Sequence, residues 1–126
     1  MTTPENSPPR VLVVVGTRPE AIKMAPVVAA LRQKPGLDSR LLLTGQHDDL
    51  VDQVLDTLDL RPAYNLEIMR EGQSLYDVAQ GCLTGLGGVV AEYEPDLLLA
   101  QGDTATVFFS SLVAFFEKTR VGHVEA

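Results

Sequence analysis

One stretch, residues 11–26, constrains the fold more than any other part of the chain. It begins with five apolar residues, four of them β-branched, and their lack of alternation is typical of a strand covered on both faces of a parallel sheet. Gly16 ends this run, and Pro19 suits the first turn of a helix, where its missing N–H would have no partner. The stretch therefore predicts a strand, a tight turn and a helix.

The turn between the predicted strand and helix carries positive charge that suits the binding of an anion. The free N–H groups of the new helix point into it, and Arg18 and Lys23 add two full positive charges. The alternative is that both side chains are solvated surface charges. A Walker A loop is excluded because Ile22, and not a glycine, directly precedes Lys23. The dinucleotide fingerprint needs three spaced glycines, and this stretch has only Gly16. We therefore expect no nicotinamide or flavin cofactor.

The same order of strand, polar turn and helix recurs along the chain. Alternation of this kind predicts an α/β fold, a Rossmann-like doubly wound parallel sheet of about five strands in the order 3-2-1-4-5. The strands are expected at residues 11–15, 40–44, 64–68, 97–100 and 120–125.

Two helices carry further expectations about packing. Ile22 in the first helix and Leu75 in the helix that follows Ser74 have the spacing of residues that face the sheet. Gly81, Gly85 and Gly88 recur on another face of that later helix, at a cost in helix stability that suggests close backbone contact with another element, such as a partner subunit's helix. The alternative is that the second half of the helix frays.

Composition narrows the classes of function. A net charge of -7, with 17 acidic and 10 basic side chains, disfavours binding to nucleic acid or to an anionic membrane. The single cysteine cannot form an internal disulfide, which fits a reducing compartment such as the cytoplasm. Residues 1–10 are polar and proline-rich, so we expect a flexible tail rather than a signal peptide or membrane anchor, followed by one domain over 11–126.

Open α/β sheets bind ligands outside the carboxyl ends of their strands, and polar residues follow each predicted strand. Asp103 and Glu125 end neighbouring strands, so two carboxylates could face one ligand and serve as an acid and a base. The alternatives are that Asp103 caps the next helix and that Glu125 is a surface charge. The candidates at this edge are Arg18, Gln46, His47, Gln73, Asp103 and Glu125.

The two histidines and the cysteine do not indicate a metal site. Neither His47 nor His123 has another ligand at a recognisable spacing, so we expect no bound metal. His47 is expected to hydrogen-bond a ligand or the backbone, and His123 is as compatible with a structural role as with a functional one. Cys82 lies in an apolar stripe and is expected in the core.

Several motifs carry a resemblance to a known family. GTRPEAIKMAP at 16–26 and GHVEA at 122–126 are the most specific, and TGQH at 44–47, PD at 95–96 and QGDT at 101–104 accompany them. With these motifs the sequence resembles the UDP-N-acetylglucosamine 2-epimerase family in its non-hydrolysing bacterial form. The resemblance covers nearly everything after the tail.

The resemblance implies an isomerase with a GT-B-like fold of two Rossmann-like domains, commonly a homodimer, that needs no metal or nicotinamide. It interconverts UDP-N-acetylglucosamine and UDP-N-acetylmannosamine for cell-envelope polysaccharides, by eliminating UDP to give 2-acetamidoglucal and adding it back. The resemblance further implies that Arg18 and Lys23 bind the nucleotide sugar and that Asp103 and Glu125 are catalytic carboxylates. Gln46, His47 and Gln73 resemble positions that hold a second, activating UDP-N-acetylglucosamine.

Members of this family continue well beyond GHVEA into a C-terminal domain. The 126 residues are therefore expected to correspond to the first five strands of the N-terminal domain, and to lack full activity alone. The alternative from another class is a non-catalytic module that binds a UDP-sugar or a partner.

Overall fold

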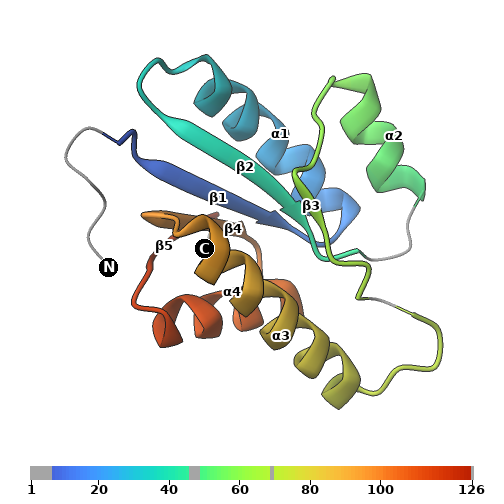
Figure 1. The fold of residues 1–126 in the computed structure, drawn as a ribbon. Coiled ribbons are helices and arrows are strands. Elements are labelled where there is room, and N and C mark those ends of the chain that lie inside the picture. The colour runs from blue at the N-terminus through green and yellow to red at the C-terminus, as the bar shows by residue number, and fades with distance from the viewer. Residues whose placement is uncertain (1–6, 46–48, 69, 126) are drawn as a thin grey trace.

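The computed structural model describes residues 7–45, 49–68 and 70–125. They form a parallel sheet with the order β3-β2-β1-β4-β5, which confirms the predicted α/β fold and strand order. Figure 1 shows α1 and α2 on one face of the sheet and α3 and α4 on the other. The strands are β1 (Arg10–Val15), β2 (Asp38–Leu43), β3 (Tyr64–Asn65), β4 (Leu97–Gln101) and β5 (Arg120–Val124). The helices are α1 (Arg18–Gln33), α2 (Asp49–Thr57), α3 (Leu75–Tyr93) and α4 (Ala105–Phe116).

Strand β1 is buried on both faces, as its unbroken apolar run predicts. Val11, Val13 and Val15 belong to the core beneath α1 and α2. Leu12 and Val14 belong to the core beneath α3 and α4. Each of these side chains is 5% exposed or less. The central strand thus joins the two cores, and its carboxyl end opens into the predicted anion-binding turn.

Helix α1 packs on the sheet through an apolar stripe that includes Met24 and Val28. Ile22 is 49% exposed, so its prediction as a sheet-facing residue is wrong. The buried stripe is one position away from Ile22, which is about 100° around the helix. Its apolar members are Ala21, Met24, Ala25 and Val28.

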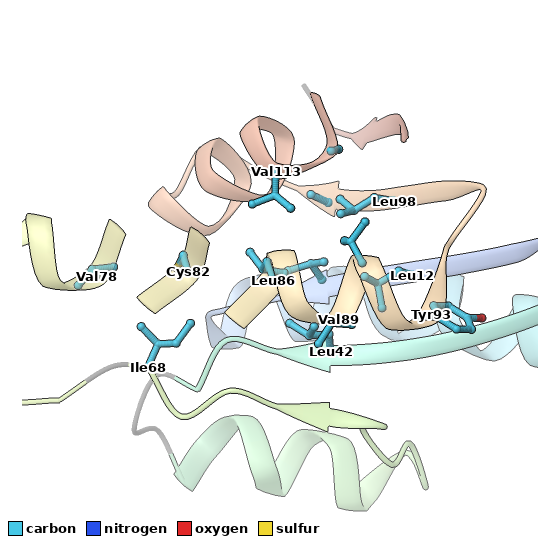
Figure 2. Packing of buried hydrophobic residues seen from close by; sticks show 14 residues of the cluster. Leu12, Leu42, Ile68, Val78, Cys82, Leu86, Val89, Tyr93, Leu98 and Val113 are labelled. Carbon is cyan, nitrogen blue, oxygen red and sulfur yellow. The ribbon is translucent and has the colours of Figure 1, made fainter. Parts of the chain in front are cut away.

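Helix α3 begins with the predicted capping box. The Ser74 hydroxyl accepts a hydrogen bond from the Asp77 backbone N–H, and the Asp77 carboxylate accepts one from the Ser74 N–H. Leu75, by contrast, is 78% exposed and does not face the sheet. The buried stripe begins at Val78. Figure 2 shows that it continues along α3 through Cys82, Leu86 and Val89 to Tyr93.

The glycines of α3 face a segment of the same chain. A Cβ atom on Gly81 would lie 2.8 Å from the Ile68 Cγ2 atom, and one on Gly85 would lie 3.0 Å from the Leu66 Cδ1 atom. Close contact with another element is therefore confirmed at these two positions, although the element is residues 66–68 and not a partner's helix. Gly88 has no atom within 4 Å of its Cβ position, so the prediction is wrong there.

Helix α4 packs through small residues and turns large ones outward. Its buried residues are Thr106, Ser110, Val113 and Ala114. Phe108, Phe115 and Phe116 are 62%, 75% and 61% exposed. Within the described ranges, no helix combines the length and the apolar character needed to cross a bilayer.

The amino ends of the strands are held by an aromatic and charged cluster. The Tyr93 hydroxyl donates a 2.6 Å hydrogen bond to the Asp38 carboxylate, and the Arg40 guanidinium lies 4.3 Å from the Tyr93 ring centroid. Burial and the bond to Asp38 raise the pKa of the Tyr93 phenol. The polar turns of interest lie at the opposite edge of the sheet.

Candidate functional site

The turn after β1 is shaped by a close approach of two threonines. Gly16 is buried, and a Cβ atom on it would lie 2.2 Å from the Thr106 hydroxyl oxygen and 2.9 Å from that of Thr44. The two hydroxyl oxygens are themselves 3.3 Å apart. Glycine is therefore required here by space, because Thr44, which follows β2, and Thr106 of α4 both lie against the turn. Arg18 and Pro19 then open helix α1.

A buried carboxylate lies directly behind this turn. Glu20 is 2% exposed, and its Oε1 atom accepts a hydrogen bond of 3.0 Å from the Gly16 N–H. Its Oε2 atom accepts bonds from the hydroxyls of Thr17, at 2.7 Å, and Thr104, at 2.9 Å. The carboxylate thus connects the turn after β1 to the turn after β4.

Sequence reasoning did not single out Glu20 or Thr104. A usable signal was present, because Thr17 and Glu20 have the separation of a capping box. The structure departs from that motif, since the Glu20 carboxylate accepts from the Gly16 N–H and Thr17 makes no side-chain cap. The bond to Thr104, 84 positions away, has no local sequence signal.

The turn after β4 carries Asp103 on the surface. Gly102 has a φ of +90°, a conformation that favours glycine, and Asp103 is exposed. Thr104, not Asp103, is the N-cap residue of α4, and it makes no side-chain cap bond. The alternative interpretation of Asp103 as a helix cap is therefore wrong.

The end of β5 is tied to helix α1 and to the turn after β4. The Lys23 Nζ atom is 2.5 Å from the Glu125 Oε1 atom, and both side chains are about half exposed. The His123 Nε2 atom lies 2.5 Å from the Gly102 carbonyl oxygen, so the ring donates to a backbone acceptor. His123 therefore has a structural bond, which links β5 to the turn that precedes Asp103.

Glu125 differs in one respect from the expectation. The sequence predicts a fifth strand over residues 120–125, but β5 ends at Val124. Glu125 has a φ of +57°, in the left-handed region, so strand alternation no longer sets the direction of its side chain. Its carboxylate reaches Lys23 from this turned conformation.

The Arg18 side chain lines a hollow that is separate from the contacts of Glu20 and Glu125. It lines a shallow pocket of about 400 Å³ between α1 and α2, together with Ile22, Gln53, Val54, Thr57 and Leu58. The structure thus brings Lys23 and Glu125 into contact and joins the turns that bear Arg18 and Asp103 through Glu20. The Arg18 side chain borders the α2 side of this assembly.

The residues predicted for a second nucleotide sugar are described only in part. Gln46 and His47 lie outside the described residues. The Gln73 side-chain amide closes the loop before α3, because Oε1 accepts from the Arg70 N–H at 2.6 Å and Nε2 donates to the Ile68 carbonyl at 2.7 Å. Gln73 also lines a pocket of about 320 Å³ beside Gly81 and Gly85.

The sequence is similar to that of known proteins over most of its length. The sequence profile of a family described as UDP-N-acetylglucosamine 2-epimerase matches residues 29–126. The UDP-N-acetylglucosamine 2-epimerase of Yersinia pestis is 49% identical, and that of Escherichia coli K12 is 47% identical, each over 117 residues. These alignments cover 93% of this chain and 31% of each relative.

Solved structures agree with the sequence relatives. The chain superposes on the UDP-GlcNAc 2-epimerase from Neisseria meningitidis bound to UDP-GlcNAc with a TM-score of 0.87 and 44% identity, covering 93% of this chain and 32% of that one. It superposes on the Methanocaldococcus jannaschii UDP-GlcNAc 2-epimerase in complex with UDP-GlcNAc and UDP with a TM-score of 0.85 and 33% identity, over 93% and 32% of the two chains. The chain therefore spans about a third of the length of these relatives.

Proposed function

The chain belongs to the UDP-N-acetylglucosamine 2-epimerase family, and on this premise we propose that it supplies the N-terminal part of an enzyme that interconverts UDP-N-acetylglucosamine and UDP-N-acetylmannosamine. The observation that carries the proposal is the contact between Lys23 and Glu125, together with the tie from Glu20 to Thr104. These contacts gather the ends of β1, β4 and β5, where a parallel sheet places its ligand. The substrates are those named for the two complexes above.

The charges at this edge suit a nucleotide sugar that leaves as UDP. Arg18 and Lys23 lie in the first two turns of α1, and they bind the diphosphate and stabilise the charge that develops on the departing UDP. Lys23 is paired with Glu125 in this structure, so a bound diphosphate competes with that carboxylate for the ammonium group. The pairing keeps the cation oriented toward the site before the ligand arrives.

Asp103 and Glu125 are the acid and base for the sugar. One carboxylate removes the proton on sugar carbon 2 while the bond to UDP breaks, which gives 2-acetamidoglucal. Proton return from the other face, with addition of UDP, inverts the configuration at that carbon. Both residues are exposed at the site edge and follow neighbouring strands, which supports access to one ligand.

The activating site and the assembly complete the proposal. Gln46, His47 and Gln73 hold a second UDP-N-acetylglucosamine, and the pocket that Gln73 lines supports this part of the proposal. The whole enzyme acts as a homodimer in the synthesis of cell-envelope polysaccharides.

Turnover in D₂O tests this function. The chain is incubated with UDP-N-acetylglucosamine, alone and with a separately produced C-terminal segment of the Escherichia coli relative, and proton NMR follows deuterium at carbon 2 and the appearance of UDP-N-acetylmannosamine. We expect binding without turnover by the chain alone and turnover by the mixture. Asp103→Asn should abolish turnover, whereas the control Asp56→Asn, at an exposed position on α2, should retain it.

Two results would contradict the proposal in different ways. Activity of the chain alone at the level of a full-length relative would show that the C-terminal domain is not needed. Binding by the chain with no turnover in any mixture would favour the non-catalytic UDP-sugar module.

A further inference from the structure

Glu20 is a buried carboxylate to which the proposed chemistry gives no role. It is 2% exposed, among the largest fully buried side chains of the protein. The three hydrogen bonds that the structure gives it come from a backbone N–H and two hydroxyls, all neutral donors. Burying a carboxylate is costly unless its oxygens are satisfied, so an acid at this position calls for an explanation.

The donors belong to two different turns of the site. Gly16 and Thr17 precede Arg18 in the turn after β1, and Thr104 directly follows Asp103 in the turn after β4. One oxygen, Oε2, is shared by the hydroxyls of Thr17 and Thr104, at 2.7 and 2.9 Å. A single carboxylate oxygen therefore sets the spacing between the turn that bears a proposed cation and the turn that bears a proposed catalytic acid.

The surroundings of Glu20 leave the two turns little freedom. Gly16 lies against Thr44 and Thr106, where even one added carbon would overlap a hydroxyl oxygen. Thr106 is 8% exposed and Thr44 is 1% exposed, so this contact is part of the packed interior. The carboxylate thus connects two turns that already rest on a rigid base.

We infer that Glu20 is a positioning residue, which holds Arg18 and Asp103 in register for one ligand by bridging the Thr17 and Thr104 hydroxyls. The inference rests on the proposed function for what those two residues bind. Glu20 itself touches neither the sugar nor the phosphates, because it lies behind the turns and is closed to solvent. The competing explanation is that Glu20 only stabilises the first turn of α1 through the helix dipole.

Substitution of Thr104 separates these explanations better than substitution of Glu20. An amide at position 20 would place an N–H group in a buried site built from donors, and the chain could fail to fold. Thr104→Val keeps the shape of the side chain and removes the hydroxyl, while Thr104→Ser keeps the hydroxyl. Neither change removes a helix cap, since Thr104 makes no side-chain cap bond.

The experiment compares the parent chain with the two variants by three measurements. These are the affinity for UDP-N-acetylglucosamine by calorimetry, the urea midpoint, and the hydrogen-exchange rate of the Gly16 amide, which donates to Glu20. We expect Thr104→Val to weaken binding by about fivefold and to speed exchange at Gly16 by about the same factor, as for the loss of one hydrogen bond. Thr104→Ser should match the parent in both.

The positioning role is overturned if Thr104→Val and Thr104→Ser have the same Gly16 exchange rate. It is also overturned if exchange accelerates in Thr104→Val while the affinity of the folded chain stays that of the parent, because the bridge would then be structural alone. If the parent chain exchanges slowly at Gly16 but binds no UDP-N-acetylglucosamine, the proposed ligand is wrong. The exchange comparison then decides by itself whether Glu20 couples the two turns.

Discussion

The Lys23 ammonium and the Glu125 carboxylate are 102 positions apart in the chain and 2.5 Å apart in space. The pair joins the second turn of α1 to the residue that follows β5. Lys23 is proposed to bind phosphate and Glu125 to act on the sugar. Their contact therefore puts the proposed phosphate-binding group next to the proposed sugar-binding group. It also means that ligand binding replaces an existing ion pair.

Removing the cation should affect binding far more than stability. Lys23→Gln is expected to lower the free energy of unfolding by about 1 kcal/mol or less, because both partners are about half exposed to solvent. The same change should weaken UDP binding by about tenfold, as for the loss of a charge-assisted contact. Calorimetry and urea unfolding measure the two effects.

The matched control is Lys34→Gln, which removes an exposed lysine at the other end of α1. Its UDP affinity should equal that of the parent chain. Equal losses of affinity in the two variants would indicate a general effect of net charge and would contradict a local role for Lys23.

Gly16 should tolerate no side chain while Thr106 keeps its hydroxyl. Gly16→Ala is expected to lower the free energy of unfolding by about 1–3 kcal/mol, because the new methyl group overlaps the Thr106 oxygen. In a Thr106→Ala background the same change should cost less, since the overlapping oxygen is gone. An equal cost in both backgrounds, measured by urea unfolding, would show that the overlap is not the cause.

Two glycines of α3 should respond in opposite directions to alanine. Gly88→Ala is expected to raise the free energy of unfolding by about 0.5–1 kcal/mol, because its Cβ position is open and alanine favours the helix. Gly81→Ala should lose that gain, since its methyl group would press on Ile68. Thermal unfolding compares the pair, and equal stabilisation by both changes would contradict the contact with residues 66–68.

Tyr93 should make the protein sensitive to alkaline pH. Burial and the bond to Asp38 raise the pKa of its phenol above the ordinary value of 10.0, so the folded chain holds this proton more tightly than the unfolded chain. The free energy of unfolding is then unaffected by this group below about pH 10 and falls as the pH rises further. Tyr93→Phe should lower stability near neutral pH, because a hydrogen bond is lost, and should flatten the alkaline decline.

Urea midpoints between pH 8 and about pH 11 test the role of Tyr93. Tyr76→Phe is the control, because that phenol is 87% exposed and its loss should leave the profile of the parent chain unchanged. A Tyr93→Phe profile as steep as that of the parent would assign the decline to other groups.

The fold followed from patterns that act locally and through topology. The unbroken apolar run from Val11 to Val15 predicts a strand covered on both faces, and its side chains do fill two cores. The repeated order of strand, turn and helix then leaves few possible strand orders for the sheet. The helix faces were harder to predict. Hydropathy alone predicts Ile22 and Leu75 to face the sheet, but both are exposed, whereas the smaller Ala21 is buried.

The edge of the sheet was predictable, but the contacts within it were not. Topology brings residues that follow β1, β4 and β5 to one edge whatever their identity, which is why Asp103 and Glu125 could be predicted to lie there. The bonds from Lys23 to Glu125 and from Thr104 to Glu20 depend on side-chain geometry between distant segments. Their residues are close only after the sheet has formed, so no spacing in the sequence signals them.

The most direct test of the central claim is a titration of the ¹⁵N-labelled chain with UDP-N-acetylglucosamine, followed by backbone NMR. The account predicts that the largest shifts fall in the turns at residues 16–20 and 102–104 and at residues 123–125, where the carboxyl ends of β1, β4 and β5 meet. Shifts confined to residues 94–96 and 117–120, at the opposite edge, or no shifts at any ligand concentration, would contradict it.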